Sequence, residues 1–379
     1  MTVLLATLGA ALVAAPAWGA PVIRLPAGGT DAGWSVVPTS SGTYVLTTAY
    51  AKKHPEAPVA RLVKVSAAGV TPAAALPVRV SYDVVAAPAE DGSAPCIGST
   101  IKSSPYVACL QGDAWVERRF TGAARTRTLL GIRRYGPSLY AFLLDGDLGV
   151  FDGKHPERFK LHASIARWDG TAWAPVASDY VLSIAATWRG AVCGALAEPL
   201  CTPLLEGSTA KSDRITLRKL GPAGWVADGR SFAQRKSDVV VGRTTALGDR
   251  LALPVFAGTS LTSLDVLTDS VAPKRIRVAT VVGTYVSAWL GSVAGVSWVS
   301  WTDYFYFDKK ETRGLVVGRA APLDLVAGAA GPATEVYATR FRDVPPGLSI
   351  EEVDGLPYAA YSQVGKTQDT VILSPLAAP

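Results

Sequence analysis

A recurring strand–turn–strand unit constrains the fold of this chain more than any other feature of its sequence. The stretch SIARWDGTAW, residues 164 to 173, predicts a strand, a tight turn on Asp169-Gly170 and the start of a second strand. Similar segments begin at residues 61, 106, 215, 263, 314 and 370. Three copies place a tryptophan just past the turn, at Trp115, Trp173 and Trp225. The repetition indicates one structural unit used many times.

Glycines that precede strand-like runs form a second, independent series. They are Gly42, Gly92, Gly136, Gly190, Gly248, Gly295 and Gly355, and successive members lie 44 to 60 residues apart. A tight hairpin turn often needs a positive φ, which glycine adopts freely. The two series alternate along the chain, so each unit contains one turn of each kind.

A period near fifty residues with about four short strands per unit is typical of a propeller blade. No segment shows the sustained i, i+3, i+4 apolar spacing of a helical solenoid. We therefore predict an all-β fold, a seven-bladed β-propeller with four-stranded antiparallel blades, forming one domain over residues 21–379. If the strands of a blade are lettered A to D from the centre outward, the glycines mark the A–B turns. The opening stretch then marks a C–D turn.

The last unit stops after its third strand, because TVILSPLAAP ends the sequence. A missing fourth strand would leave an open edge, which proteins usually cover. The segment PVIRLPAG, residues 21 to 28, belongs to no unit. We predict that it pairs as strand D of the last blade and so closes the ring.

Residues 1–20, MTVLLATLGAALVAAPAWGA, are apolar or small throughout and end in small residues, as a secretory signal peptide does. The segment has no Lys or Arg at its start, which departs from the usual pattern. We expect cleavage near residues 17 to 20, with an uncleaved membrane anchor as the alternative. Export to the periplasm or outside the cell follows, and no later segment is long and apolar enough to span a bilayer.

The four cysteines fall into two local pairs, Cys96 with Cys109 and Cys193 with Cys201. In each pair the two residues lie in successive strand-like runs, so in an exported protein they predict two disulfides that join neighbouring strands. Neither pair has metal-ligand spacing. We expect no metal and no cofactor.

The formal net charge is +6, and one segment is strongly basic. RRFTGAARTRTLLGIRR, Arg118 to Arg134, carries six arginines and no acid. A solvated edge is the favoured interpretation. The alternative is attraction to an acidic polymer or an anionic surface. Nucleic acid is not expected as a partner of an exported chain without interleaved stacking residues.

Aromatic and charged residues open the predicted A strands. In a propeller these first positions surround the mouth of the central channel, where they suit a sugar or small polar ligand. The candidates are Trp34, Tyr82, Asp83, Arg127, Asp179, Tyr180, Asp238, Tyr285 and Glu335. The favoured alternative is structural, with aromatics filling gaps between blades and acids accepting hydrogen bonds from backbone amides.

The motif KHPE occurs at 53–56 and 154–157, in predicted B–C loops, and DKKE at 308–311 takes the same place in the sixth unit. His54 and His155 raise a metal hypothesis, but one whole blade separates their units. Turn formation around proline explains the motif better. His162 stands alone on a predicted strand, where a satisfied or exposed histidine is the default.

The turn W-D-G-x-x-W at 168–173 resembles those of secreted bacterial propellers of the kelch and WD-like type, which more often bind or scaffold than catalyse. VIRLP, residues 22 to 26, also resembles the arginine-containing element that starts sialidases, with Arg24 at the arginine position. DGTAW resembles an Asp-box, but its Asp and Gly are adjacent. Sialidases have six blades, and the predicted closure of the ring puts Arg24 on an outermost strand. We therefore assign Arg24 no catalytic role from this resemblance.

The sequence contains no nucleophile elbow, phosphate-binding loop, dinucleotide glycine motif or HExxH zinc motif. We therefore expect a ligand-binding or protein-interaction module at the cell surface or in the periplasm rather than an enzyme. The alternative is a glycan-processing hydrolase or lyase whose acids come from distant blades, with Asp83, Asp238 and Glu335 as candidates.

Overall fold

The computed structural model describes residues 20–376. Gaps fall at 52–53, 67, 78–83, 103, 123–126, 145–159, 184–200, 209–211, 222–223, 236, 243–244, 249, 258–262, 270–274, 281–284, 308–312, 343–346 and 366–367. The described part contains strands and turns and no α-helix. Accordingly, no helix there has the length and apolarity needed to cross a membrane.

The described strands pair into seven antiparallel sheets. The first three sheets contain the following strands, in order from one edge to the other: β2 (Thr30–Thr39), β3 (Gly42–Ala51), β4 (His54–Ser66) and β5 (Gly69–Pro72); β6 (Val85–Pro88), β7 (Pro95–Ile101), β8 (Ser104–Gln111) and β9 (Ala114–Glu117); β10 (Thr128–Tyr135), β11 (Ser138–Leu144), β12 (Lys160–Trp168) and β13 (Trp173–Ser183). Each of these sheets is a four-stranded meander.

The next three sheets are less regular. They contain β14 (Cys201–Ser208), β15 (Ser212–Gly221) and β16 (Gly224–Arg235); β17 (Val239–Val240) and β18 (Thr245–Leu247), both beside β19 (Arg250–Ala257), then β20 (Ser263–Thr268) and β21 (Arg275–Thr280); β22 (Tyr285–Val293), β23 (Val296–Tyr306) and β24 (Arg313–Asp324), with both β25 (Ala329–Ala330) and β26 (Thr334–Arg342) beside β24. The last sheet is β27 (Leu348–Val353), β28 (Leu356–Gln363), β29 (Thr370–Pro375) and β1 (Ile23–Pro26).

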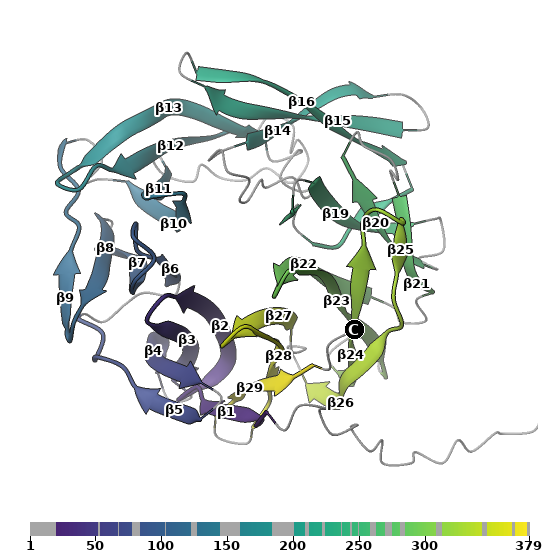
Figure 1. Cartoon of the computed structure of the whole chain (residues 1–379), viewed down its shortest axis with the longest axis horizontal. Coiled ribbons are helices and arrows are strands. Elements are labelled where there is room, and N and C mark those ends of the chain that lie inside the picture. The colour runs from purple at the N-terminus through teal and green to yellow at the C-terminus, as the bar shows by residue number, and fades with distance from the viewer. Residues whose placement is uncertain are drawn as a thin grey trace, which may run out of the picture.

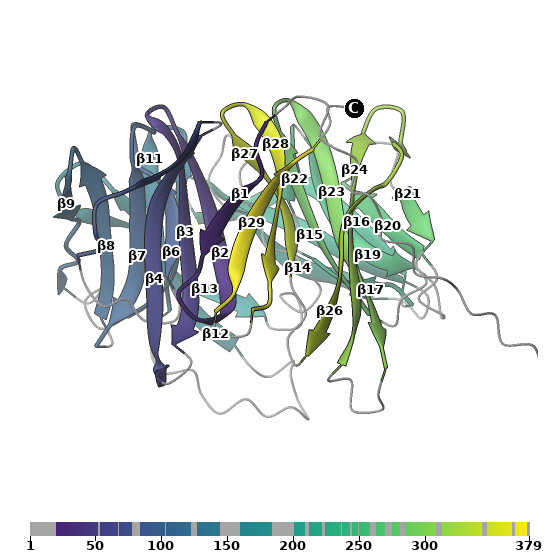
Figure 2. The same cartoon turned by 90° about the horizontal axis from the view of Figure 1, so that it is seen from below.

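The sheets stand side by side in a ring around a central opening (Figure 1), with the first strand of each sheet innermost. Seen from the side (Figure 2), many strands, such as β3, β4, β7 and β29, run roughly across the thickness of the ring. A radial arrangement of antiparallel sheets is the architecture of a β-propeller. The predicted all-β fold is therefore confirmed, and four of the seven described sheets have the predicted four antiparallel strands.

Hydrophobic clusters fill the spaces between neighbouring sheets. The cluster between the second and third sheets contains Leu129, Leu139 and Trp173, and that between the last sheet and the first contains Leu25, Val45 and Tyr358. Both faces of a sheet are thus buried, which explains the many apolar positions on successive strand residues and the hydrophobic content of 49%.

The glycine series lies where the repeat predicts, between the first and second strands of a sheet. Gly92, Gly136, Gly248 and Gly355 have φ values of 74°, 54°, 64° and 75°. Such values disfavour residues with a Cβ atom. Gly190 lies outside the described residues. Because each of these turns needs a residue with a positive φ, the spacing of the glycines in the sequence follows the spacing of the sheets.

Trp115 and Trp173, which follow C–D turns, each form a hydrogen bond to the neighbouring unit. The indole N–H of Trp115 in β9 donates to the carbonyl oxygen of Ala75 at 2.9 Å, and that of Trp173 in β13 donates to Arg118 at 2.9 Å. Ala75 and Arg118 both lie just beyond the outermost strand of the preceding sheet. At these two junctions the recurring tryptophan therefore satisfies a backbone acceptor, whereas the side chain of Trp225 lies outside the described residues.

The segment β1 pairs with β29 at the outer edge of the last sheet, with Arg24 opposite Ile372 and Leu25 opposite Val371. Figure 2 shows β1 in purple beside the yellow β29. Ile23 and Leu25 are both 4% exposed, whereas Arg24 between them is exposed. The alternation in burial is that of a strand with one face on the core.

Two strand assignments from the sequence are wrong. Asp179 and Tyr180 lie on β13, the outermost strand of its sheet, and do not open an A strand. Glu335 lies on β26, which shares the outer side of β24 with the two-residue strand β25. In both places a long or broken outermost strand continues into the segment that the period alone assigns to the next unit.

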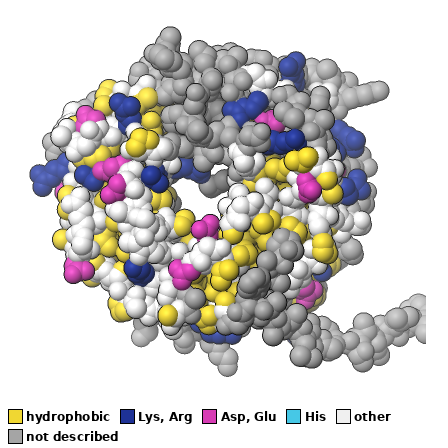
Figure 3. Space-filling model, in the orientation of Figure 1, with side chains coloured by type: hydrophobic (Ala, Val, Ile, Leu, Met, Phe, Trp, Pro, Cys, Tyr) yellow, Lys and Arg dark blue, Asp and Glu magenta, His cyan; other side chains and the backbone are white. Residues whose placement is uncertain are grey.

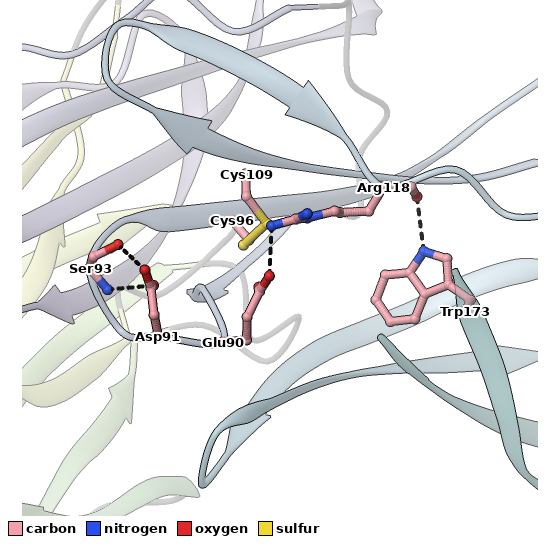
Figure 4. Close-up of a disulfide and its surroundings, with 7 residues drawn as sticks. All are labelled: Glu90, Asp91, Ser93, Cys96, Cys109, Arg118 and Trp173. Carbon is pink, nitrogen blue, oxygen red and sulfur yellow. Dashed lines mark hydrogen bonds and ion pairs between the residues drawn. A yellow bond between two sulfur atoms is a disulfide. The ribbon is translucent and has the colours of Figure 1, made fainter. Parts of the chain in front are cut away.

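The disulfide Cys96–Cys109 is present and joins residues directly opposite each other on β7 and β8. Figure 4 shows it beside Glu90, whose carboxylate accepts a hydrogen bond from Arg118 at 2.7 Å. Sulfur and carboxylate oxygen atoms of Glu90, Cys96 and Cys109 lie within 4.8 Å of one another, but the sulfurs are bonded together and offer no thiolate. The second predicted pair includes Cys193, which lies outside the described residues.

Replacing both Cys96 and Cys109 with alanine is expected to lower the free energy of unfolding by about 3 kcal/mol, because the loop that the bond closes spans 13 positions. Urea unfolding of the variant and of the wild-type protein measures the difference. Reducing the wild-type protein with dithiothreitol should shift its midpoint in the same direction. A variant as stable as the oxidised wild type would contradict the expectation.

Candidate functional site

Three of the predicted channel-mouth residues lie on or next to innermost strands. Trp34 is on β2, Tyr285 is the first residue of β22, and Arg127 directly precedes β10. Arg127 donates a hydrogen bond to the hydroxyl of Ser164 at 2.5 Å. The side chain of Tyr285, and Tyr82 and Asp83 altogether, lie outside the described part of the chain.

Asp238 precedes the innermost strand β17, but its carboxylate is enclosed in an ion-pair network. Its Oδ2 atom lies 2.5 Å from Arg275 Nη2 and accepts the backbone N–H of Arg235 at 2.8 Å. Arg275 also lies 3.0 Å from Asp265, which pairs with Arg277 at 2.6 Å. The side chain of Asp238 is 0% exposed. Substrate cannot reach this acid, so its arrangement is structural.

Glu335 is a poor candidate for catalysis at the channel mouth because it lies on an outermost strand with 43% of its side chain exposed. It faces Arg319, whose other terminal nitrogen binds the buried carboxylate of Asp303. Burial raises the pKa of Asp303, while the Arg319 guanidinium opposes that shift. Asp238 and Glu335 thus belong to two separate arginine-centred networks.

The structure brings together a different group of residues, which we call the seam site: Trp34 on β2 and Ser349 and Glu351 on β27. The indole N–H of Trp34 donates to the Ser349 hydroxyl oxygen at 3.0 Å. Ser349 and Glu351 are two positions apart on one strand, so their side chains share a face. That face packs against the first sheet, because Val353, two further positions along, contacts the cluster around Val45. Both strands are innermost in their sheets.

No basic residue occurs on the strands that surround the seam site. The sequences of β2, β3, β27 and β28 contain no Lys, Arg or His, and their acids are Asp31, Glu351 and Glu352. Figure 3 shows acidic side chains beside the central opening on the face in view. Glu351 is half-buried, and burial raises its pKa to about 7, although a hydrogen bond from Ser349 acts in the opposite direction.

The folded protein should therefore lose stability as the pH rises. Below pH 4.5, the ordinary pKa of the group, Glu351 is protonated in the folded and unfolded states alike. Between pH 4.5 and about 7 the folded state binds the extra proton, so the free energy of unfolding falls through this window, by about 3 kcal/mol.

Glu351→Gln should remove this component of the pH dependence, because glutamine does not titrate. Glu352→Gln, on the same strand but the opposite face, is the matched control and should behave as the wild type does. Urea unfolding of all three proteins between pH 4.5 and 8 measures the effect. Parallel curves for Glu351→Gln and the wild type would contradict it.

Sequence reasoning nominated Trp34 but missed Ser349 and Glu351. The spacing of the sequence could have located them. In most units the predicted channel-mouth residue lies 8 to 10 positions before the A–B glycine, whereas Glu335 lies 20 positions before Gly355. The shorter offset leads directly to the start of β27, where Ser349 and Glu351 follow within a few residues.

The arginines between 118 and 134 do not form one free basic surface. Arg118 pairs with Glu90 and lies over the ring of Trp168 at 4.8 Å, and Arg134 donates to the carbonyl oxygen of Glu90 at 2.9 Å. Arg119 is 82% exposed and faces Glu117. Attraction of an acidic polymer to this segment stays a prediction, carried by exposed members such as Arg119.

The histidine motifs lie mostly outside the described residues. His54 begins β4, so the first KHPE motif runs into a strand instead of staying in a loop. His155, the second KHPE motif and DKKE are outside the described residues, as is the side chain of His162. Among the described residues, only Glu90, Cys96 and Cys109 bring three possible metal-ligand atoms close together. The two sulfur atoms are bonded to each other in the disulfide, so they are not available as thiolate ligands.

No protein-family model and no curated protein sequence matches this chain. Among solved structures, it is similar to prolyl oligopeptidase B from Galerina marginata (8% identity, 87% of this chain and 46% of that one, TM-score 0.40). It is also similar to the Trypanosoma rangeli sialidase in complex with sialic acid (9%, 91% and 58%, TM-score 0.38). A third is a putative 6-phosphogluconolactonase from Bacteroides fragilis (11%, 94% and 94%, TM-score 0.40). The chain spans about half the length of the first two, and likeness this low says nothing of activity.

Proposed function

We propose that this protein is an exported, seven-bladed β-propeller, a single domain over residues 21–379 whose ring is closed by β1. In this proposal it works as a ligand-binding module at the cell surface or in the periplasm, and it holds a small polar ligand at the seam site. The seven described sheets and the pairing of β1 with β29 support the closed ring. The disulfide Cys96–Cys109 supports export, since such bonds persist in oxidising compartments.

The observation that carries the binding function is the hydrogen bond from Trp34 to Ser349 beside a half-buried acid. A large aromatic surface next to a hydroxyl and a carboxyl group is a common way to hold a polar ligand, because the ring excludes water while the polar atoms orient the ligand. The seam site joins strands from the two ends of the chain, separated by 315 positions. All three residues lie on strands of the sheets and not on loops.

The alternative function, a glycan-processing hydrolase or lyase, would require two accessible carboxyl groups about 5 to 10 Å apart. The described candidates offer little support for it. Asp238 is enclosed by Arg275 and a backbone amide, and Glu335 lies on an outer strand beside Arg319. Asp369, another buried acid, accepts the backbone N–H groups of Ala32 and Gly365. Acids held in this way stabilise structure.

A glycan array and a panel of chromogenic glycosides, applied to the same protein samples, test the proposal. We expect saturable binding without turnover, weakened about tenfold by Trp34→Phe, which keeps an aromatic ring but loses the indole N–H. Glu352→Gln is the control and should bind as the wild type does. Turnover that disappears in Glu351→Gln would establish the hydrolase instead, and failure to bind any polar probe would contradict the module.

A further inference from the structure

Buried acids described elsewhere in this molecule are compensated by arginine or, as Asp369 is, by backbone N–H groups. Asp238 and Asp265 share Arg275, Asp303 pairs with Arg319, and Glu90 pairs with Arg118. Taking a carboxylate out of water without a counter-charge is costly, so such pairing is what folding alone favours. Glu351 departs from this pattern, because the strands packed around it carry no base.

The groups around Glu351 suit a cation that comes from outside the protein. Trp34 contributes an indole, the aromatic side chain with the strongest attraction for cations. Ser349 places its hydroxyl between the indole N–H and the carboxyl group. The residue Glu351 is partly exposed, and β27 is the innermost strand of its sheet, so a ligand would approach the group from the central opening (Figure 1).

The remaining titratable groups on the neighbouring strands do not supply a positive charge. They are Asp31 on β2, Tyr44 and Tyr50 on β3, Glu352 on β27, and Tyr358 and Tyr361 on β28. β22 and β23 pack on the other face of β27, and their acid Asp303 already pairs with Arg319. The seam site therefore has negative charge available and no internal partner for it among the described residues.

We propose that the seam site binds an organic cation, a ligand with a quaternary or primary ammonium group, with Glu351 as its counter-ion and Trp34 as its aromatic wall. This inference rests on the proposed binding function and specifies its ligand class. A bound ammonium group supplies the charge that the surrounding strands lack, so the carboxylate form of Glu351 becomes favourable and its proton is released on binding.

Calorimetry with choline and with 3,3-dimethyl-1-butanol tests the proposal at pH 8. The two molecules have nearly the same shape, but only choline is charged, and its charge does not depend on pH. We expect choline to bind at least tenfold more tightly than the alcohol. Glu351→Gln should remove this preference, whereas Glu352→Gln should keep the wild-type affinity within about twofold, as expected for a group outside the contact.

Repeating the choline titration from pH 5.5 to pH 8 adds a second readout. Affinity should rise with pH, by up to tenfold per unit below about pH 7, because the cation selects the deprotonated acid. Near pH 6.5, buffers with different ionisation enthalpies should reveal proton release by the wild type and none by Glu351→Gln.

The outcomes separate this inference from the proposed function. Equal affinity for choline and its neutral analogue, or no binding of choline by the wild type, would overturn the cation site. Glycans that bind through Trp34 while choline does not would overturn it too, but would leave the binding module standing. A protein that binds neither choline nor any glycan would contradict both.

Discussion

Leu25→Asp is expected to lower the free energy of unfolding by more than about 4 kcal/mol. Leu25 is 4% exposed and packs in the cluster between the last sheet and the first. The substitution removes buried apolar surface, which by itself costs about 2–5 kcal/mol, and leaves a carboxylate without a partner in the same space. Chemical denaturation followed by tryptophan fluorescence measures the effect.

The adjacent residue provides the control. Arg24 is exposed on the same strand, so Arg24→Asp should change stability by no more than about 1 kcal/mol. If the two variants were equally stable, β1 would not contribute to the core of the last sheet. The cost of Leu25→Asp therefore measures how much of the fold depends on the first strand of the chain.

Asp265→Ala is expected to lower the free energy of unfolding by about 3–5 kcal/mol. The side chain of Asp265 is 1% exposed and accepts hydrogen bonds from both Arg275 and Arg277. Its removal takes away the carboxylate partner of Arg277 and leaves Arg275 with Asp238 alone, and breaking a buried ion pair costs more than the pair itself contributes. Thermal and urea unfolding at neutral pH measure the change.

A surface pair and a conservative variant complete the test. Glu117→Gln, which breaks the exposed pair with Arg119, should cost no more than about 1 kcal/mol. Asp265→Asn, whose side-chain oxygen can still accept a hydrogen bond from Arg275 or Arg277, should lose less stability than Asp265→Ala does. A loss for Asp265→Ala as small as that for Glu117→Gln would show that the network adds little to stability.

Much of the architecture could be predicted from local features. Gly136 and Gly355 mark turns that need a positive φ, and Trp173 follows a hairpin turn at a junction between sheets. These requirements act within a few residues, so they leave a period in the sequence. The Cys96–Cys109 disulfide was predictable for the same reason, because its two strands follow each other directly.

The candidate site was harder to predict because its contacts connect distant parts of the chain. Whether Asp238 is free or paired depends on Arg275, which lies 37 positions away. Arg275 is not one of the recurring residues of the repeat, so the sequence pattern does not predict this pairing. The contact between Trp34 and Ser349 depends on where the two ends of the chain meet. Glu335 was misplaced because two strands, β25 and β26, pair with the outer side of β24. The sequence prediction therefore assigned the segment of β26 to the first strand of the next sheet, which is β27.

Cross-linking of β1 to β29 tests most directly whether the start of the chain completes its last sheet. Pro26 lies opposite Thr370, so cysteines at these two positions should form a disulfide that links peptides 344 residues apart, detected by mass spectrometry of the unreduced protein. Pro26→Cys with Ser374→Cys moves one partner four residues along the strand, roughly 13 Å, and should not cross-link. A bond in the second variant, or in neither, would contradict the pairing on which the seam site depends.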